Sequence, residues 1–289
     1  MPPQNPLFTR LPTEALPLGL GCSRLGSING ATGDEARALV KLALDHGVRF
    51  FDTSNIYGQG DSERVLGDVL GQRDDCIVCS KAGKHLSLKM QALAPFKSVL
   101  RTVARRSDQA RRGVAAARAR PMPTCWDAAF LSGSIDASLR RLKRERIEMF
   151  MLHSPSAEVV ARGEAVGALE QARNAGKVDL IGVSVDDVAT AEAALRDPRV
   201  KALQVPLHPG DTAYDAVVER AAQMGVAIIA REILGGTQAI AGQRDPAAYA
   251  RGRIIEMIRA PGVSLPLVGT TRTANLNASI EAARAASAG

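Results

Sequence analysis

Residues 48–58 read Val48-Arg49-Phe50-Phe51-Asp52-Thr53-Ser54-Asn55-Ile56-Tyr57-Gly58. The largely apolar start, 48–51, predicts a buried strand, and the strand ends in a carboxylate, small polar residues and a tyrosine. In parallel α/β proteins, functional side chains gather at the carboxyl ends of the strands. The stretch therefore predicts a site around Asp52 and Tyr57. These residues alone leave a second interpretation open, a polar turn with a packing tyrosine.

Strand-like and helix-like segments alternate along the whole chain. The expected strands are 16–20, 48–51, 76–80, 147–152, 178–183, 200–205, 226–230 and 264–268. The expected helices are 34–46, 62–70, 127–144, 158–175, 186–195, 212–224, 246–259 and 273–286. This order implies parallel strands joined by crossover helices. Eight repeats within 289 residues predict an α/β fold, a (β/α)8 TIM barrel forming one domain over 1–289, preceded by a short hairpin at 8–18.

One connection is too long for this repeat. The polar strand ends fall at 52, 81, 153, 184, 204, 231 and 269, and one unit spans about 30 residues, so the step from 81 to 153 has about 40 residues in excess. The excess coincides with a basic segment: Lys84 to Arg120 holds ten Lys and Arg and one acid, in a chain of net charge +7. We predict an insertion over 84–123, after the third strand, at the rim where active sites lie.

The basic insertion 84–123 has three possible roles. It could be a solvated rim loop, or a lid that supplies cations to an anionic substrate or to cofactor phosphates. Nucleic-acid binding is the weakest interpretation, because Phe96 is its only aromatic residue and no known module is recognisable. Trp126, just after the insertion, is a candidate for lining the substrate pocket or for anchoring the following helix.

Composition and cysteine placement exclude several classes of protein. No apolar run approaches the roughly 20 residues of a membrane span, and the N-terminus lacks the layout of a signal peptide, so we expect no membrane association and a cytoplasmic location. Cys76 and Cys79 form a C-x-x-C pattern within an expected strand. Side chains three residues apart on a strand point to opposite faces, which argues against a redox pair. We expect no metal site.

The glycine-rich stretch 19–26 is not a Rossmann loop. Its sequence is Gly-Leu-Gly-Cys-Ser-Arg-Leu-Gly, so Arg24 occupies the position of the last glycine in G-x-G-x-x-G. No helix follows directly, as that motif requires. The glycines are better explained by tight turns at the end of a strand.

Three strand ends should bring Asp52, Lys81 and His153 to one mouth of the barrel, with Tyr57 on the loop after Asp52. A lysine at this mouth needs a carboxylate to remain charged, and Asp52 is the available neighbour. An ammonium beside a phenol lowers the phenol's pKa, so Tyr57 could donate a proton to a carbonyl oxygen and take one back in reverse. A nearby histidine could orient the same oxygen.

Each of these residues also has a structural interpretation. Lys81 could cap a strand at the surface, His153 could be a hydrogen-bonded core histidine, and Tyr57 could pack against its neighbours. Their joint placement at one face of one barrel favours the catalytic interpretation.

The chain resembles the aldo-keto reductases over nearly its whole length outside the insertion. The motif Asp52-Thr53-Ser54-x-x-Tyr57-Gly58 is similar to that family's Asp-Thr-Ala-x-x-Tyr-Gly. The other matching segments are Ser80-Lys81, Ser138-Leu139-x-Arg141-Leu142, Leu152-His153-Ser154-Pro155, Gly176-Lys177-Val178 and Ile181-Gly182-Val183-Ser184. The resemblance implies a catalytic tetrad: Tyr57 as general acid, Lys81 tuning it, Asp52 pairing with Lys81, and His153 positioning the carbonyl.

The resemblance also implies NADP(H), bound across the barrel mouth. The candidate cofactor contacts are Ser184, Gln204, Arg231, Gly269, Thr270, Thr271 and Arg272. Arg272 is the expected cation for a 2′-phosphate. Four positions depart from the family pattern: Val185 replaces an asparagine, Leu207 replaces a stacking aromatic, and Ala278 and Ser279 replace Glu and Asn. His208, which follows Leu207, is a candidate substitute. These departures predict weakened cofactor binding.

The expected function is an NADPH-dependent oxidoreductase that reduces an aldehyde or ketone, or runs in reverse on an aldose. The expected partner is a small carbonyl compound, with no nucleic acid, and the chain should be a monomer or a small homo-oligomer. Two alternatives remain. One is a slow or inactive cofactor-sensing or scaffolding protein on the same fold, like the potassium-channel β subunits. The other is a basic adaptor that acts through 84–123.

Overall fold

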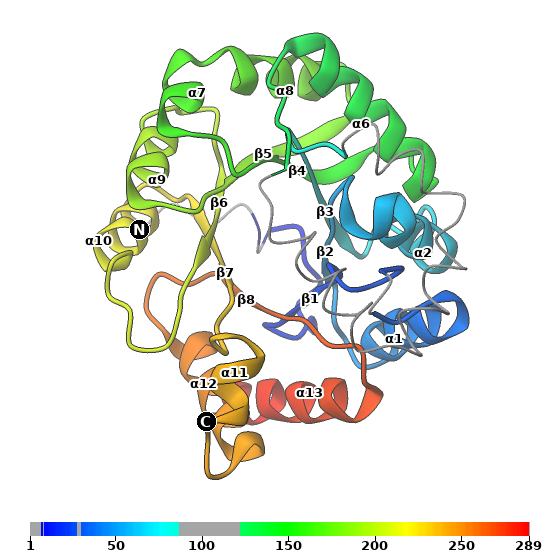
Figure 1. Ribbon diagram of the computed structural model, residues 1–289, viewed down its shortest axis with the longest axis vertical. Coiled ribbons are helices and arrows are strands. Elements are labelled where there is room, and N and C mark those ends of the chain that lie inside the picture. The colour runs from blue at the N-terminus through cyan, green and yellow to red at the C-terminus, as the bar shows by residue number, and fades with distance from the viewer. Residues whose placement is uncertain (1–6, 8, 28–29, 87–121, 289) are drawn as a thin grey trace.

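Eight parallel strands close into a barrel in chain order, as the alternating pattern predicts (Figure 1). The computed structural model describes residues 7, 9–27, 30–86 and 122–288. The strands are β1 (Gly19–Gly21), β2 (Phe50–Asp52), β3 (Ile77–Ala82), β4 (Ile147–His153), β5 (Val178–Ser184), β6 (Ala202–Pro206), β7 (Ala227–Arg231) and β8 (Leu265–Val268). Closure comes from β1, which pairs with both β2 and β8. The predicted TIM barrel is therefore confirmed.

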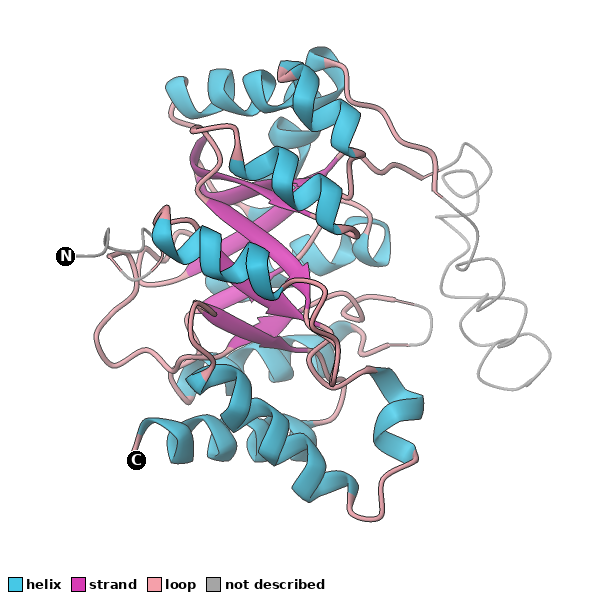
Figure 2. Cartoon of the chain, turned by 90° about the vertical axis from the view of Figure 1, so that its left-hand side faces the viewer, coloured by secondary structure: helices cyan, strands magenta, loops and turns pink. Residues whose placement is uncertain are grey.

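Helices form a ring around the strands (Figure 1), and in the side view they lie above, below and in front of the strands (Figure 2). They are α1 (Gly33–Asp45), the short 3-10 helix η1 (Tyr57–Gly60), α2 (Asp61–Leu70), α6 (Ala128–Leu142), α7 (Ala157–Arg162), α8 (Glu164–Asn174), α9 (Val188–Leu195), α10 (Asp215–Gln223), α11 (Gly236–Ala241), α12 (Pro246–Arg259) and α13 (Thr273–Ser287). In α1 the buried positions Ala36, Leu39, Val40 and Ala43 form one face. This spacing of three and four residues lays an apolar stripe on the sheet. No helix among the described residues is long and apolar enough to cross a membrane.

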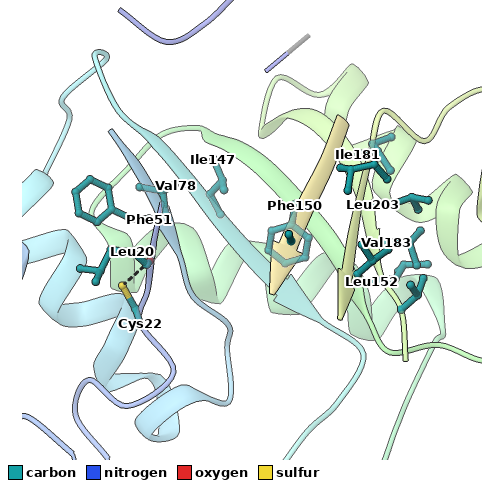
Figure 3. Close-up of a cluster of buried hydrophobic side chains, with 14 of the residues drawn as sticks. Leu20, Cys22, Phe51, Val78, Ile147, Phe150, Leu152, Ile181, Val183 and Leu203 are labelled. Carbon is teal, nitrogen blue, oxygen red and sulfur yellow. Dashed lines mark hydrogen bonds between the residues drawn. The ribbon is translucent and has the colours of Figure 1, made fainter. Parts of the chain in front are cut away.

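Alternation along each strand separates two apolar cores. Phe50 points into the barrel, whereas its neighbour Phe51 points out toward the helices. The interior is filled by buried side chains from Leu7, Phe50, Ile77, Cys79, Met149, Met151, Ala202, Ala227, Ile229, Leu265 and Leu267. Figure 3 shows outward-facing strand residues such as Val78, Phe150 and Val183, which belong to the outer core. Because the side-chain period of a strand is two, this packing fixes which residues reach the barrel mouth.

Three of the four cysteines lie in the two cores. Cys79 lies inside the barrel and Cys76 lies between strands and helices, so the prediction of opposite faces is confirmed. All four cysteines are free thiols. Burial raises the pKa of the Cys76 thiol to about 11, with a further contribution from the charge of Asp75. Burial also raises the pKa of the Cys22 and Cys79 thiols.

We expect a thiol reagent to label one cysteine of the native protein. Cys125 is half-buried, whereas Cys22, Cys76 and Cys79 are buried. The thiolate is the reactive form, and buried thiols with raised pKa values hold little of it near neutral pH. Intact-mass spectrometry after brief maleimide treatment should show one adduct on the native chain and four after denaturation. A second native adduct, or a Cys125→Ser variant that still labels rapidly, would contradict this expectation.

Two expected elements differ in the structure. The hairpin at 8–18 is absent from the described part of that stretch, which forms turns. Pro12 and Pro17 have no N–H for a strand ladder, and Leu7 packs into the barrel core instead. The expected helix 158–175 is two helices, α7 and α8, separated at Gly163 with a φ of 76°. This left-handed conformation ends α7, and glycine adopts it without a Cβ clash.

The predicted insertion 84–123 lies almost entirely outside the described residues. Its described ends are close together, since Lys84 and Thr124 form an isolated antiparallel bridge. The Pro123 carbonyl also accepts a hydrogen bond from the His85 N–H at 2.9 Å. The chain therefore leaves the barrel after β3 and returns to the same place before α6.

Candidate active site

The carboxyl ends of consecutive strands carry polar side chains into the barrel mouth. Asp52, Lys81 and His153 stand two residues after the interior side chains of Phe50, Cys79 and Met151. Ser184 and Gln204 continue this layer on β5 and β6, where Ser184 lies in register with both His153 and Gln204. All five residues are buried. The strand period alone thus brings together the polar residues that the sequence placed at strand ends.

Lys81 and Asp52 form a buried ion pair. The Lys81 Nζ lies 2.5 Å from Asp52 Oδ1 and donates a second hydrogen bond to the Thr53 carbonyl at 2.9 Å. The Lys81 side chain is fully buried. Burial acts to lower the pKa of Lys81, but the charge of Asp52 and the hydrogen bond to it outweigh burial, and the pKa is raised. Lys81 is therefore a fixed ammonium inside the barrel mouth.

Gln204 extends this pair toward β5. Its Nε2 donates to Asp52 Oδ1 at 2.7 Å, and its Oε1 accepts from the Ser184 hydroxyl at 3.0 Å. These bonds orient the Gln204 amide, whose sequence-predicted role is cofactor binding. Asp52 thus accepts from a cation and from an amide, as a buried carboxylate requires.

Tyr57 begins η1, directly above the ion pair. Its ring centroid lies 5.3 Å from Lys81 Nζ and 5.8 Å from the His153 ring, which it meets edge to face. The following Gly58 has a φ of 57°, and a Cβ there would lie 2.7 Å from the Leu25 carbonyl oxygen. Only glycine fits this close backbone approach, so Gly58 allows the loop that carries Tyr57 to pack against the loop containing Leu25.

The expected lowering of the Tyr57 pKa is wrong in its net direction. Burial raises the pKa of Tyr57, and the opposing effect of Lys81 is smaller, so the pKa lies above its ordinary value. The reason is that the same packing that brings Lys81 close also removes water from the phenol. The result still suits an acid, because Tyr57 keeps its proton at neutral pH.

His153 is a neutral imidazole. Burial, followed by the charges of Lys81, Lys84 and Arg231, holds its pKa well below the ordinary value. Its Nδ1 lies 3.0 Å from the hydroxyl of Ser54, a residue not singled out from the sequence. The sequence signal that could have pointed to Ser54 is a serine at the position where the aldo-keto reductase motif has alanine.

A cleft of about 360 Å³ opens beside Tyr57. Its lining combines Asp52, Tyr57, Gln204, Arg231 and Gly269 with residues that sequence reasoning missed. These are Gly21 at the end of β1, Ser23 and Arg24 after it, and Glu232, Ile233, Leu234, Gly236, Thr237 and Ile240 around α11. The Gly235-Gly236 pair, in the connection after the expected strand 226–230, was the sequence signal for the second group. Among the residues that the structure describes, no group of His, Cys, Asp or Glu could hold a metal ion.

Arg231 is tied to acidic neighbours at the rim of the cleft. It donates to Asp186 Oδ1 at 2.5 Å and to the Val185 carbonyl at 2.8 Å, and it pairs with Glu232. Lys84 donates to the Ser154 hydroxyl at 2.8 Å and lies 3.8 Å from Asp186. The cations of the rim therefore form a network with the loops after β3, β4, β5 and β7.

The residues that depart from the family pattern lie in different surroundings. Val185 and Leu207 are buried in the outer core. His208, the candidate substitute, pairs with Glu232 at 3.4 Å. Ala278 is exposed on α13, and Ser279 donates to the Asn275 carbonyl of its own helix.

The other predicted residues lie at the edges of the site. Thr270, Thr271 and Arg272 follow Gly269, outside the lining of the cleft, and Arg272 is the exposed N-cap residue of α13. Trp126 packs against Gly83, where its ring leaves no room for a side chain, and lines a separate pocket. The structure thus places Trp126 beside the β3 loop and not in the cleft with Tyr57.

A closed parallel barrel with a buried Lys–Asp pair, a tyrosine and a neutral histidine at its mouth defines a class of barrel enzymes. Residues 17–253 match the model of the aldo/keto reductase family. The chain belongs to this family and is an NAD(P)H-dependent oxidoreductase.

Individual relatives agree with this assignment. The chain is 27% identical to a 6-dehydroglucose reductase of Novosphingobium aromaticivorans, over 97% of this chain and 91% of that protein. It is 33% identical to a D-threo-aldose 1-dehydrogenase of a Pseudomonas species, over 60% of this chain and 51% of that enzyme. Other matches also span about half of the relative, 47% in one from Mycobacterium bovis. An aldo-keto reductase of Klebsiella pneumoniae solved with NADPH has the same fold, with a TM-score of 0.65 and 21% identity, over 93% of this chain and 86% of that one.

Proposed function

We propose that this chain is an NADP(H)-dependent reductase of aldehydes or ketones, in which Tyr57 is the general acid. The observation that carries the proposal is the arrangement around Tyr57: the buried Lys81–Asp52 pair lies 5.3 Å from its ring centroid and His153 lies edge to face with it. A buried ammonium is costly unless it is paired, so its retention beside a phenol argues for a function.

The cleft is the proposed site of the dinucleotide. Gly21 and Gly269 both line it, and a Cβ on Gly21 would lie 3.7 Å from the Gly269 Cα. Arg24 and Arg231 are cations of the lining, although Arg231 also pairs with Asp186 and Glu232, and Gln204, bonded to Ser184, supplies a polar group. Arg272, exposed beyond the cleft, is the proposed contact for a 2′-phosphate. When bound, the reduced nicotinamide supplies the hydride.

Each catalytic residue has a separate task in carbonyl reduction. Tyr57 donates the proton that the carbonyl oxygen takes up as the carbon is reduced, and it accepts a proton in the oxidation direction. Lys81 stabilises the tyrosinate left behind, because a nearby ammonium favours the charged phenolate. His153, being neutral, can donate one hydrogen bond to the carbonyl oxygen and orient it. Asp52 keeps Lys81 charged.

A polyhydroxylated carbonyl compound is the proposed substrate class. Two relatives are named for sugar derivatives, a 6-dehydroglucose reductase and a D-threo-aldose 1-dehydrogenase. The described rim is polar around His153, where the Lys84 ammonium donates a hydrogen bond to the Ser154 hydroxyl. Polar groups of this kind can hydrogen-bond the hydroxyls of a substrate.

Titration with NADPH and NADH tests the cofactor side of the proposal. We expect micromolar NADPH binding and a loss of about tenfold in NADPH affinity for Arg272→Ala, with little change for NADH, because the 2′-phosphate is the group that Arg272 would contact. Arg162→Ala is the matched control, an exposed arginine on α7 across the barrel from α13 (Figure 1). Intrinsic fluorescence or calorimetry measures both affinities.

The outcome separates the enzyme from the alternative role. NADPH binding followed by turnover of an aldose or glyceraldehyde supports the reductase. Tight NADPH binding with no turnover of any carbonyl compound would favour the cofactor-sensing or scaffolding protein. Failure to bind either nucleotide at millimolar concentration would overturn the proposal and point to Val185, Leu207, Ala278 and Ser279 as the disabling changes.

A further inference from the structure

Ser54 connects the loop after β2 to the catalytic histidine on β4. Its side chain is fully buried, and its hydroxyl lies 3.0 Å from His153 Nδ1, although the two residues are 99 positions apart. Ser54 stands between Asp52 and Tyr57 in the same short loop. The mouth of the barrel therefore contains a buried hydroxyl that touches His153 on the ring nitrogen next to Cβ.

A neutral histidine has one ring proton, and its position decides what the ring can do. With the proton on Nε2, His153 can donate to a carbonyl oxygen. With the proton on Nδ1, Nε2 presents a lone pair, which repels that oxygen. The tautomer is set by the hydrogen bond that the other nitrogen makes. In this structure the hydrogen-bond partner of His153 Nδ1 is the Ser54 hydroxyl.

The Ser54 hydroxyl has one proton and three acceptors within reach. Besides Nδ1 these are Asn55 Oδ1 at 3.1 Å and the Lys81 carbonyl at 3.4 Å. The Lys81 carbonyl already accepts the Asn55 N–H at 3.2 Å. The Asn55 amide is oriented by its own bond from Nδ2 to the Lys84 carbonyl at 3.2 Å. Nδ1 is the nearest of the three, and with the ring proton on Nε2 it is a buried acceptor that is costly to leave unpaired.

We propose that Ser54 is a positioning residue that donates its proton to His153 Nδ1 and so holds the proton of the ring on Nε2, facing the substrate oxygen. This inference rests on the proposed reductase function. It assigns a role to the one position of the Asp52–Gly58 motif where serine replaces the alanine of the resembling pattern. A hydroxyl here presets the ring tautomer before the substrate arrives.

Nitrogen-15 NMR of the protein tests this assignment without turnover. The ring nitrogen shifts of a histidine show which nitrogen carries the proton, and the signal of His153 is identified by its loss in His153→Gln, since the chain has four histidines. We expect a protonated Nε2 in the wild-type protein with bound NADP+, and a mixture of tautomers in Ser54→Ala. A wild-type ring protonated on Nδ1 would overturn the proposal, whether or not the protein proves to be a reductase.

Steady-state kinetics with NADPH and glyceraldehyde gives the second readout. Loss of a positioning hydrogen bond should lower kcat of Ser54→Ala about tenfold and leave the KM for NADPH unchanged. Ser54→Cys, with a weaker donor of similar size, should fall between the two. Ser80→Ala is the matched control: Ser80 is also a buried serine, but it donates to Glu63 at 2.6 Å, away from His153. If Ser54→Ala keeps the wild-type kcat within twofold, Ser54 does not position His153.

Discussion

Tyr57→Phe is expected to lower kcat for carbonyl reduction by about 10²–10⁴ and to leave NADPH affinity nearly unchanged. The substitution removes one oxygen and keeps the ring that meets Lys81 and His153. Because burial raises the pKa of Tyr57, the phenol holds its proton throughout the neutral range. Without it, the carbonyl oxygen has no acid positioned to protonate it as hydride arrives.

The pH dependence of the wild-type enzyme follows from the same group. Reduction needs protonated Tyr57, so its rate should be level around neutral pH and fall only as the pH passes the raised pKa, above the ordinary tyrosine value of about 10. The absorbance of reduced nicotinamide measures the rate. Oxidation of the alcohol needs the opposite protonation state and should rise over the same range.

Tyr249→Phe is the matched control for this variant. Tyr249 lies on α12, and its hydroxyl donates to the carbonyl of Leu234 at the edge of the cleft at 3.4 Å, so the same atom is removed from a residue with no proposed catalytic role. Its kcat should stay within about threefold of the wild-type value, as expected for loss of one weak hydrogen bond. If Tyr57→Phe keeps more than a tenth of the activity, Tyr57 is not the general acid.

Lys81→Met should both inactivate and destabilise the protein. Methionine fills a similar volume, but Asp52 then remains buried with its charge unpaired, although Gln204 still donates to it. Removal of one partner of a buried ion pair costs about 3–5 kcal/mol of folding free energy. Urea denaturation measures this loss, and kcat should fall by about 10²–10³, as when an electrostatic contact to the transition state is removed.

The pH dependence of the folding stability tests whether Lys81 acts as the charged partner of Asp52. Its pKa is raised in the folded state, so its contribution to stability is fully present below the unfolded-state value of about 10.4 and is lost as the pH rises through the folded-state value. The stability difference between wild type and Lys81→Met should therefore be constant through the neutral range.

Two further variants serve as comparisons for the stability lost in Lys81→Met. Lys143→Met breaks the exposed Lys143–Asp68 pair, with 2.6 Å between its charged atoms, and should cost less than about 1 kcal/mol. Asp52→Asn combined with Lys81→Met removes both buried charges and should recover part of the lost stability while remaining inactive. A double variant less stable than Lys81→Met alone would contradict this explanation.

The sequence by itself determined the barrel and the residues of its mouth. Eight alternating strand and helix patterns permit few arrangements, because parallel strands need crossover helices. Asp52, Lys81 and His153 follow apolar strand residues at even spacing, and the two-residue period of a strand carries them to the same side as Phe50, Cys79 and Met151. The opposite faces of Cys76 and Cys79 follow from the same geometry.

Tertiary structure alone decided the features that depend on contacts between distant segments. The net direction of the Tyr57 pKa is a balance between burial and the charge of Lys81, and the extent of burial comes from the folding of several loops onto the mouth. The packing of Trp126 on Gly83 and the burial of Val185 and Leu207 in the outer core lie beyond strand ends, where no periodicity directs a side chain. The hydrogen bond between Ser54 and His153 joins the loop after β2 to β4, which are far apart in sequence, so local pattern could not reveal it.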